Sequence, residues 1–376
     1  MKKSPKEPDQ PTTPTDLSTH ATPDGTQRYT AQFRSRFAHD FYRESALGLS
    51  VSSIGLGTYL GDPTDVDDAA YVAAVGQAIA SGINLIDTAI NYRNQRSERV
   101  LCVALQAAIQ SGRVHRDELV VCTKGGYIPL NRVAPENRAD YQAYVRREFV
   151  ETEILGPDDI IGGGHSLAPR FIRYCVAKSR QNLGLRTIDL YYVHNPEQQL
   201  VSVSEDELYE RLAATFAVLE EATERGEIKH YGIATWDGLR TAPGTAGHLS
   251  LERVVEAAKR VGGRGHRLRA VQLPVNLAMS EAVRVPTQVV AGRHLTVLQA
   301  AAELGLSVIG SATLMQARLT TGLPPTVREH FQMLDTDAQR AIEFARTIEG
   351  MTSSLVGMKR TEHVTENLGA AAVRSN

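Results

Sequence analysis

The chain has 376 residues, of which 42% are hydrophobic and 22% charged, and its formal net charge is −2. These values permit a large buried core and exclude global disorder, and the charge balance argues against a nucleic-acid or membrane-surface protein, which would carry a basic excess. The three cysteines show neither a disulfide framework nor a zinc-ligand spacing, and no apolar run reaches the roughly 18–20 residues that span a bilayer, so we expect a cytoplasmic protein without a metal site or membrane segment.

The first segment of the chain, residues 1–28, is rich in Pro and Thr, and the first aromatic residue is Tyr29. No apolar stretch follows its lysines, which distinguishes it from a signal peptide. Because so little apolar surface cannot offset the entropy of ordering, we predict a flexible, disordered tail over residues 1–28 and a single domain over residues 29–376.

From about residue 51, short apolar runs alternate with longer amphipathic stretches. Each run is bounded by Gly, polar or charged residues, the pattern of a strand buried on both faces. The predicted strands are Val51–Leu56, Ile83–Thr88, Leu119–Lys124, Ile188–His194, His230–Thr235, Ala270–Val275, Leu306–Ser311 and Ser353–Gly357. The predicted helices are Asp67–Ala80, Gln95–Ser111, Ala168–Leu183, Ser204–Arg225, Leu251–Val261, His294–Leu304, Thr336–Ile348 and Glu362–Ala371.

Eight such alternations over about 320 residues predict an α/β fold of the (β/α)8 TIM-barrel type. The alternative is a doubly wound sheet, which would carry a glycine fingerprint after its first strand. The segment Gly55-Leu56-Gly57-Thr58-Tyr59-Leu60 lacks the third glycine of that fingerprint.

Two connections are unusually long, residues 125–167 after the third strand and residues 276–293 after the sixth. Both follow a strand, so both open at the C-terminal face of a barrel, where active sites lie. We expect the insertion 125–167 to form a lid and part of the substrate wall, and the alternative is a structural excursion beside the barrel.

Four titratable residues follow apolar runs at the predicted C-terminal face: Asp87, Tyr92, Lys124 and His194. A tyrosine can donate a proton, and a nearby lysine ammonium would lower its pKa from the ordinary value near 10. A carboxylate would keep the lysine charged, and a neutral histidine would orient a carbonyl oxygen. Each residue alone has an ordinary structural explanation as a cap, a packing residue or a solvated charge, but the set on consecutive strands favours carbonyl chemistry with a hydride donor.

The run Asp87-Thr88-Ala89-Ile90-Asn91-Tyr92, followed by Ser97-Glu98, closely resembles the strand-two signature of the aldo-keto reductases. Further resemblance lies in Ile54–Thr58, Cys122–Lys124, Ile188–His194, Gln272, Gly357 and the pair Glu366-Asn367. The resemblance implies a (β/α)8 barrel with Asp87, Tyr92, Lys124 and His194 as a catalytic tetrad.

The same resemblance implies that NADP(H) lies extended across the barrel mouth. The residues expected to bind it are Gln272 and Thr235 at the nicotinamide, Ser311, Leu314 and Gln316 over the pyrophosphate, Gly357, Lys359, Arg360 and His363 around the adenosine ribose and its 2′-phosphate, and Glu366 and Asn367 at the adenine. Cations beside a helix N-terminus suit a 2′-phosphate, which favours NADP over NAD.

Several positions depart from the family pattern. Ala234-Thr235 stands where many members carry Ser-Asn, Val275 where many stack a tyrosine on the nicotinamide, and Asn195 where an aromatic residue follows the histidine. Trp236 either supplies the missing aromatic surface or packs in the barrel rim.

We therefore expect an NADP(H)-dependent oxidoreductase that interconverts a small-molecule carbonyl compound and an alcohol, with Tyr92 as the proton donor. The alternatives are a redox-sensing regulatory barrel that binds NADP(H) with little turnover, and another barrel enzyme such as a sugar isomerase, which needs no nicotinamide. No nucleic-acid or membrane partner is expected, and the sequence does not define the substrate or the oligomeric state.

Overall fold

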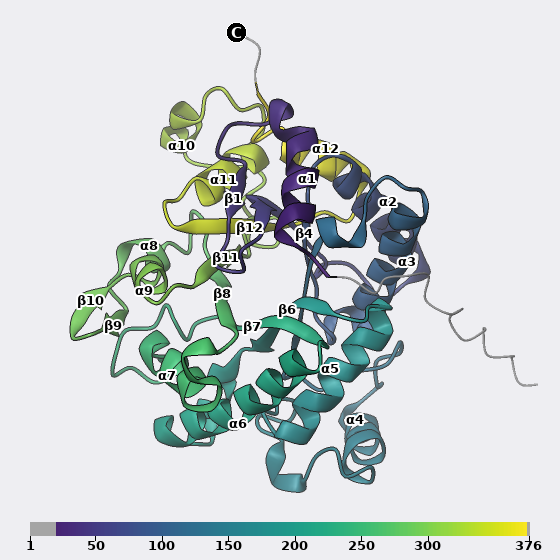
Figure 1. Cartoon of the computed structure of the whole chain (residues 1–376), viewed down its shortest axis with the longest axis vertical. Coiled ribbons are helices and arrows are strands. Elements are labelled where there is room, and N and C mark those ends of the chain that lie inside the picture. Colours follow the sequence, from purple (N-terminus) through teal and green to yellow (C-terminus); the bar gives the residue numbers. More distant parts are fainter. Residues whose placement is uncertain (1–19, 374–376) are drawn as a thin grey trace, which may run out of the picture.

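The computed structural model describes residues 20–373, and within this range eight parallel strands close into a barrel (Figure 1). The barrel strands are β3 (Ile54–Gly57), β4 (Leu85–Asp87), β5 (Val120–Gly125), β6 (Ile188–His194), β7 (Ile228–Ala234), β8 (Leu268–Pro274), β11 (Ser307–Ser311) and β12 (Met351–Gly357). They pair in chain order, and β12 closes the ring against β3. The predicted barrel is therefore confirmed, and the doubly wound alternative is excluded.

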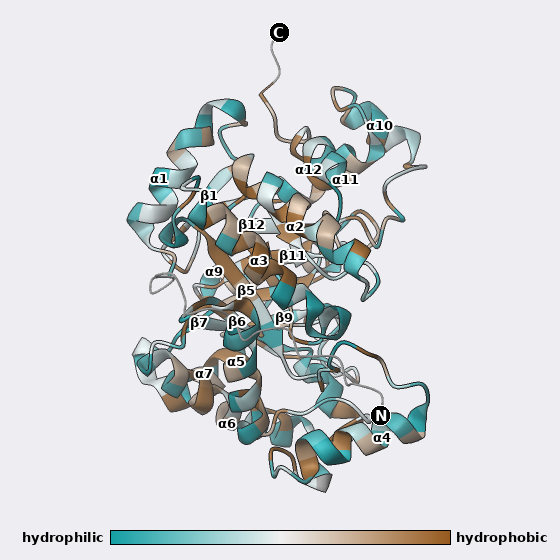
Figure 2. Ribbon diagram, turned by 90° about the vertical axis from the view of Figure 1, so that its right-hand side faces the viewer, coloured by the Kyte–Doolittle hydropathy of each residue, from teal (hydrophilic) through white to brown (hydrophobic). Residues whose placement is uncertain are grey.

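Helices surround the barrel, and all but α1 come after the first barrel strand in the chain. Their bounds are α1 (Pro23–Phe33), α2 (Asp65–Ala80), α3 (Arg96–Gln110), α4 (Arg138–Val145), α5 (Pro169–Leu183), α6 (Glu205–Glu224), α7 (Leu251–Gly262), α8 (Glu281–Arg284), α9 (Val297–Glu303), α10 (Pro325–His330), α11 (Asp337–Arg346) and α12 (Thr361–Leu368). Figure 2 shows apolar residues concentrated along the central strands, while polar residues predominate on the outer faces of the helices.

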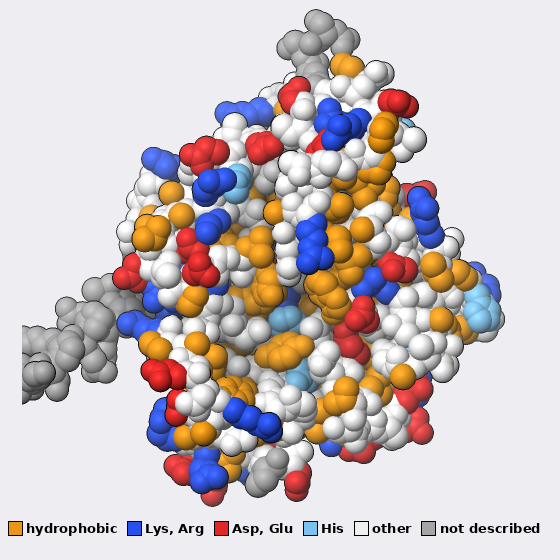
Figure 3. All heavy atoms as spheres, turned by 180° about the vertical axis from the view of Figure 1, so that it is seen from behind, with side chains coloured by type: hydrophobic (Ala, Val, Ile, Leu, Met, Phe, Trp, Pro, Cys, Tyr) orange, Lys and Arg blue, Asp and Glu red, His pale blue; other side chains and the backbone are white. Residues whose placement is uncertain are grey.

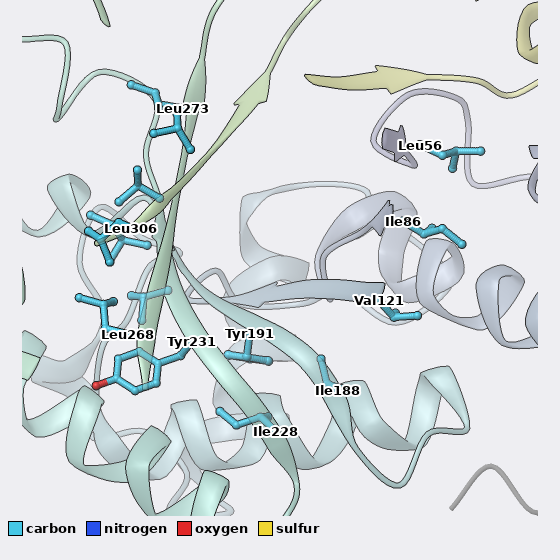
Figure 4. Close-up of a cluster of buried hydrophobic side chains, with 14 of the residues drawn as sticks. Leu56, Ile86, Val121, Ile188, Tyr191, Ile228, Tyr231, Leu268, Leu273 and Leu306 are labelled. Atoms are coloured by element: carbon cyan, nitrogen blue, oxygen red, sulfur yellow. The ribbon is translucent and has the colours of Figure 1, made fainter. Parts of the chain in front are cut away.

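The barrel strands bury side chains on both of their faces, because successive residues of a strand point in opposite directions. Leu190 and Tyr192 of β6 belong to the cluster inside the barrel, together with Ala270 of β8. Tyr191 belongs to the second, larger cluster between strands and helices, part of which Figure 4 shows. This double burial explains why the strands appear in the sequence as unbroken apolar runs.

The first predicted strand, Val51–Leu56, is wrong in one respect, because the structure divides it. Its beginning lies in β2 (Ser50–Ser52), which pairs antiparallel with β1 (Tyr42–Glu44), and its end lies in β3. Between them the Ser53 N–H donates to the Phe41 carbonyl at 2.7 Å, which redirects the chain into the barrel.

The predicted start of the helix His294–Leu304 is also wrong. A second hairpin, β9 (Gln288–Val290) with β10 (Arg293–Leu295), occupies part of the long connection after β8. Helix α9 begins after it because Thr296 and Gln299 form a reciprocal capping box there.

The expected tail needs correction at its end. Residues 1–19 lie outside the described residues, but the structure places residues 23–28 in α1. Thr22 accepts a hydrogen bond from the Gly25 N–H, Pro23 occupies the first turn, and Tyr29 and Phe33 are buried. Tyr29 and Phe33, which continue the same helix, supply the apolar surface that residues 1–28 lack by themselves.

The insertion 125–167 packs mainly beside the barrel rather than over its mouth. Its helix α4 lies outside the ring of strands in Figure 1. Phe149 is 0% exposed. Its ring centroid lies 5.8 Å from that of Phe171 and 5.5 Å from that of Tyr174, both on α5. This part of the insertion therefore matches the alternative of a structural excursion beside the barrel. Elsewhere in the insertion, Tyr127 and His165 contact the site described below.

Replacing Phe149 by Ala is expected to lower the free energy of unfolding by about 3–5 kcal/mol, because it leaves a cavity between the insertion and α5. Urea denaturation would measure the loss. Val133→Ala is the matched control, since this side chain of the same insertion is 79% exposed. A Phe149→Ala protein as stable as the Val133→Ala protein would contradict the packing described here.

Candidate active site

The four titratable residues predicted as a tetrad meet at one end of the barrel. Asp87 is the last residue of β4, Lys124 is the fifth of six residues in β5, and His194 ends β6. Tyr92 begins a short turn of 3₁₀ helix, Tyr92–Gln95, after β4. The strands are parallel and in register, so their carboxyl ends bring these side chains together.

A buried ion pair lies at the centre of the group. The Lys124 ammonium donates to Asp87 Oδ1 and, at 2.8 Å, to the Thr88 carbonyl, while Gln272 Nε2 donates to Asp87 Oδ2 at 2.9 Å. Lys124 and Asp87 are 0% and 3% exposed. Burial disfavours the ammonium, but Asp87 and Tyr92 outweigh this effect and raise the pKa of Lys124, so the lysine is charged at neutral pH.

Tyr92 lies beside this ion pair. Lys124 Nζ is 5.1 Å from the centroid of its ring, and the rings of Tyr92 and His194 are 6.0 Å apart at an interplanar angle of 77°. The sequence predicts that Lys124 lowers the pKa of Tyr92. Burial has the larger effect and raises this pKa in spite of Lys124, so Tyr92 is a protonated phenol at neutral pH.

His194 is a neutral imidazole. Burial, with Lys124 and His165 nearby, holds its pKa well below the ordinary value. Its Nδ1 is buried and has no hydrogen-bond partner among the described residues. A neutral ring next to the Tyr92 phenol can take part in hydrogen bonding to an oxygen atom placed between them.

Two residues of the tetrad, Asp87 and Tyr92, line a cavity of about 680 Å³, and Lys124 and His194 are not among its lining residues. The cavity is lined by Asp87 and Tyr92 and by ten of the eleven residues expected to bind the cofactor: Gln272, Ser311, Leu314, Gln316, Gly357, Lys359, Arg360, His363, Glu366 and Asn367. The face opposite the view of Figure 1 carries hydrophobic side chains around a central hollow (Figure 3). Residues from β8, β11, β12 and α12 are thus gathered around one space.

Thr235 is the expected cofactor residue that the structure does not place among the described residues lining this cavity. It is 4% exposed, and its Oγ1 is buried without a hydrogen-bond partner in the described chain. Its main-chain N–H donates to the Gln272 carbonyl at 2.8 Å. Thr235 therefore contacts Gln272, which lines the cavity, but does not line the cavity itself.

The cationic end of the cavity is already partly paired. Lys359 Nζ donates to both carboxylate oxygens of Asp67 at 2.9 Å, which lowers the pKa of Asp67. The Arg360 guanidinium donates to His363 Nε2 at 2.6 and 3.2 Å. Asp67 also accepts a hydrogen bond from the Asp62 N–H at 2.7 Å. Gly61 packs against this ion pair, because a Cβ there would lie 2.6 Å from Asp67 Oδ2, and its φ of +100° also favours glycine.

The positions that depart from the family pattern have separate contacts. Val275 is 0% exposed and belongs to the hydrophobic core. Asn195 Nδ2 donates to the Tyr127 hydroxyl at 3.0 Å. Trp236 is 43% exposed, which leaves part of its aromatic surface accessible, and its main-chain N–H donates to Glu197 Oε1 at 2.7 Å.

Some residues of the site were not singled out from the sequence. Tyr59 and Gly61 line the cavity, and the Tyr59 ring packs 5.0 Å from that of Tyr92. Their place after the first barrel strand was a usable signal, because loops after barrel strands open at this face. Asp67 lies within a helix pattern and carries no such signal.

Two general features concern the whole of residues 20–373. No helix in this range combines the length and apolar character that crossing a membrane requires. No group of three or more His, Cys, Asp or Glu side chains in this range is arranged to hold a metal ion.

Comparison with known proteins places the chain in a family. A family model described as the Aldo/keto reductase family matches residues 53–242, half of the chain. The protein therefore belongs to the aldo/keto reductase family.

Two curated relatives and one solved structure illustrate this similarity. The chain is 31% identical over 194 residues to the D-threo-aldose 1-dehydrogenase of a Pseudomonas species, covering 51% of this chain and 52% of that protein. It is 30% identical over 195 residues to the NADH-specific methylglyoxal reductase of Escherichia coli K12, covering 50% of each. The chain thus spans about half the length of the curated relatives it matches. The fold resembles that of an aldo/keto reductase from Klebsiella pneumoniae crystallised with NADP and acetate, at a TM-score of 0.58, 19% identity and coverage of 89% and 91%.

Proposed function

We propose that the protein is an NADP(H)-dependent oxidoreductase that interconverts an aldehyde or ketone and an alcohol. The observation that carries the proposal is the buried, charged Lys124 held by Asp87 beside the protonated Tyr92, at the edge of a cavity of about 680 Å³. Membership of the aldo/keto reductase family supports it.

The tetrad residues have complementary roles in this reaction. The Tyr92 hydroxyl donates its proton to the carbonyl oxygen in reduction and accepts it back in oxidation. Lys124 stabilises the phenolate that remains, Asp87 keeps Lys124 charged and in place, and neutral His194 orients the oxygen. NADPH, when bound, supplies the hydride that the carbonyl carbon receives.

The cavity suits an extended dinucleotide. It runs from Tyr92 and Gln272 at the tetrad to Glu366 and Asn367 on α12, and cationic Lys359 and Arg360 lie toward the second end. Gln272 would hold the nicotinamide amide, the segment Ser311–Gln316 would cover the pyrophosphate, and Lys359, Arg360 and His363 would hold a 2′-phosphate. The aldo/keto reductase from Klebsiella pneumoniae that was crystallised with NADP supports the same cofactor.

The direct test is a titration with NADPH and NADH that follows nicotinamide fluorescence, and then NADPH oxidation with a panel of aldehydes and ketones. Tight NADPH binding with turnover of at least one carbonyl compound is expected. Binding without turnover across the panel would favour the regulatory barrel, and absence of binding would overturn the cofactor assignment.

Neutralising Lys359 and Arg360 together, each to Gln, is expected to weaken NADPH binding by a few kcal/mol at most, because each charge-assisted hydrogen bond contributes about 1.5–3 kcal/mol. NADH binding should change little, since NADH has no 2′-phosphate. Fluorescence titration of both cofactors measures the difference. Equal weakening of both would refute a 2′-phosphate role for these cations.

A further inference from the structure

The returning end of the insertion 125–167 reaches the active site through His165. This side chain is 3% exposed, and its Nε2 lies 2.7 Å from the main-chain carbonyl oxygen of His194. The Tyr127 ring packs edge-on against both imidazoles, with centroids 4.9 Å from His165 and 5.0 Å from His194. His165 therefore binds the backbone of a tetrad residue although it lies 29 positions earlier in the chain.

Neighbouring side chains define the protonation state of His165. Arg211 Nη1 donates to Gln199 Oε1 at 2.7 Å, so the amide nitrogen of Gln199 faces His165 Nδ1 at 2.8 Å. Nδ1 must accept that hydrogen bond, and the carbonyl of His194 requires Nε2 to donate. Both contacts select the neutral Nε2–H tautomer, and burial lowers the pKa of His165 to about 4, consistent with that state.

The hydrogen bond acts at the point where the chain leaves β6. Asn195 adopts a left-handed conformation with φ +46°, and its N–H donates to the Ala234 carbonyl at 2.6 Å, so the peptide after His194 is held on one side by β7. His165 holds its other end, the carbonyl oxygen. Gly126 makes the approach possible, because a Cβ there would lie 2.9 Å from that oxygen and 3.1 Å from His165 Nε2.

We propose that His165 is a positioning residue, which fixes the orientation of the His194 ring by holding the main-chain carbonyl of His194. Arg211 and Gln199 keep His165 in the tautomer that can donate this bond. The predicted effect on turnover rests on the proposed function, but the effect on the His194 ring does not.

The test compares three variants. His165→Leu removes the donor, His165→Gln places an amide nitrogen close to the position of Nε2, and Tyr141→Phe is the matched control. Tyr141 lies in the same insertion, and its hydroxyl donates to the Gly163 carbonyl at 2.9 Å rather than to a tetrad residue. The readouts are kcat for carbonyl reduction, Kd for NADPH, and long-range ¹H–¹⁵N spectra of the histidine rings.

His165→Leu is expected to lower kcat by about 10-fold or more and to leave Kd for NADPH within about twofold, because small displacements of catalytic groups cost rate more than binding. His165→Gln should recover most of the rate, and Tyr141→Phe should match the wild type. In the spectra, wild-type His165 should show the Nε2–H tautomer, and the His194 signals should shift in His165→Leu only.

The proposal is overturned if His194 signals and kcat are unchanged in His165→Leu, or if His165→Leu and Tyr141→Phe lower kcat equally. If His165→Leu does not fold, Gln199→Leu replaces it, since loss of the amide frees the His165 ring and should shift the same His194 signals. A wild-type protein without turnover would contradict the proposed function alone, because the spectra still report on His194.

Discussion

Replacing Tyr92 by Phe is expected to lower kcat for carbonyl reduction by at least about 100-fold, the usual size of a general-acid contribution. The substitution removes the hydroxyl but keeps the ring, which packs 5.0 Å from Tyr59 and 6.0 Å from His194. Steady-state kinetics with NADPH and an aldehyde would measure the change.

Cofactor titration is the control for that experiment. Kd for NADPH should stay close to the wild-type value, since the lost hydroxyl belongs to the carbonyl site. A Tyr92→Phe protein that reduced aldehydes at the wild-type rate would show that another group donates the proton.

Replacing Lys124 by Met should reduce both stability and activity. The variant leaves the buried Asp87 carboxylate without its cation, and loss of one member of a buried ion pair costs about 3–5 kcal/mol. Urea denaturation at pH 7 would measure this loss. The deficit should shrink as the pH falls, because an unpaired carboxyl group in this site can be protonated and neutral.

A double variant separates the two effects of that substitution. Adding Asp87→Asn removes the unpaired charge and should recover part of the stability, while kcat stays low because the ammonium beside Tyr92 is still missing. If the double variant were as unstable as Lys124→Met alone, the unpaired carboxylate could not be the source of the instability.

The barrel was predictable because each strand is buried on both faces and is followed by an amphipathic helix. The predicted Ile188–His194 coincides with β6, and the other barrel strands differ from prediction by a few residues. The division at Ser53 was not predictable, since it depends on a hydrogen bond to Phe41 that only the folded chain brings near.

In the candidate site, too, residues marked by a local sequence pattern could be predicted, whereas residues that depend on contacts made only in the folded chain could not. Asp87, Lys124 and His194 could be identified because a titratable residue at the end of an apolar run lies at the strand terminus. The roles of Asp67 and His165 could not be identified from the sequence. Asp67 is 292 positions from its partner Lys359, and His165 acts from an irregular insertion without periodicity.

The pairing of β12 with β3 has a consequence for how the chain is made. Ser354 pairs with Ile54, so the ring closes only when residues about 300 positions apart meet. That contact carries the entropic cost of closing a long loop, and it can form only near the end of synthesis. A chain whose synthesis ended before residue 351 would lack β12, so β3 and β11 would each be left with an unpaired edge. Such nascent chains should bind chaperones or aggregate, whereas the completed barrel presents neither edge.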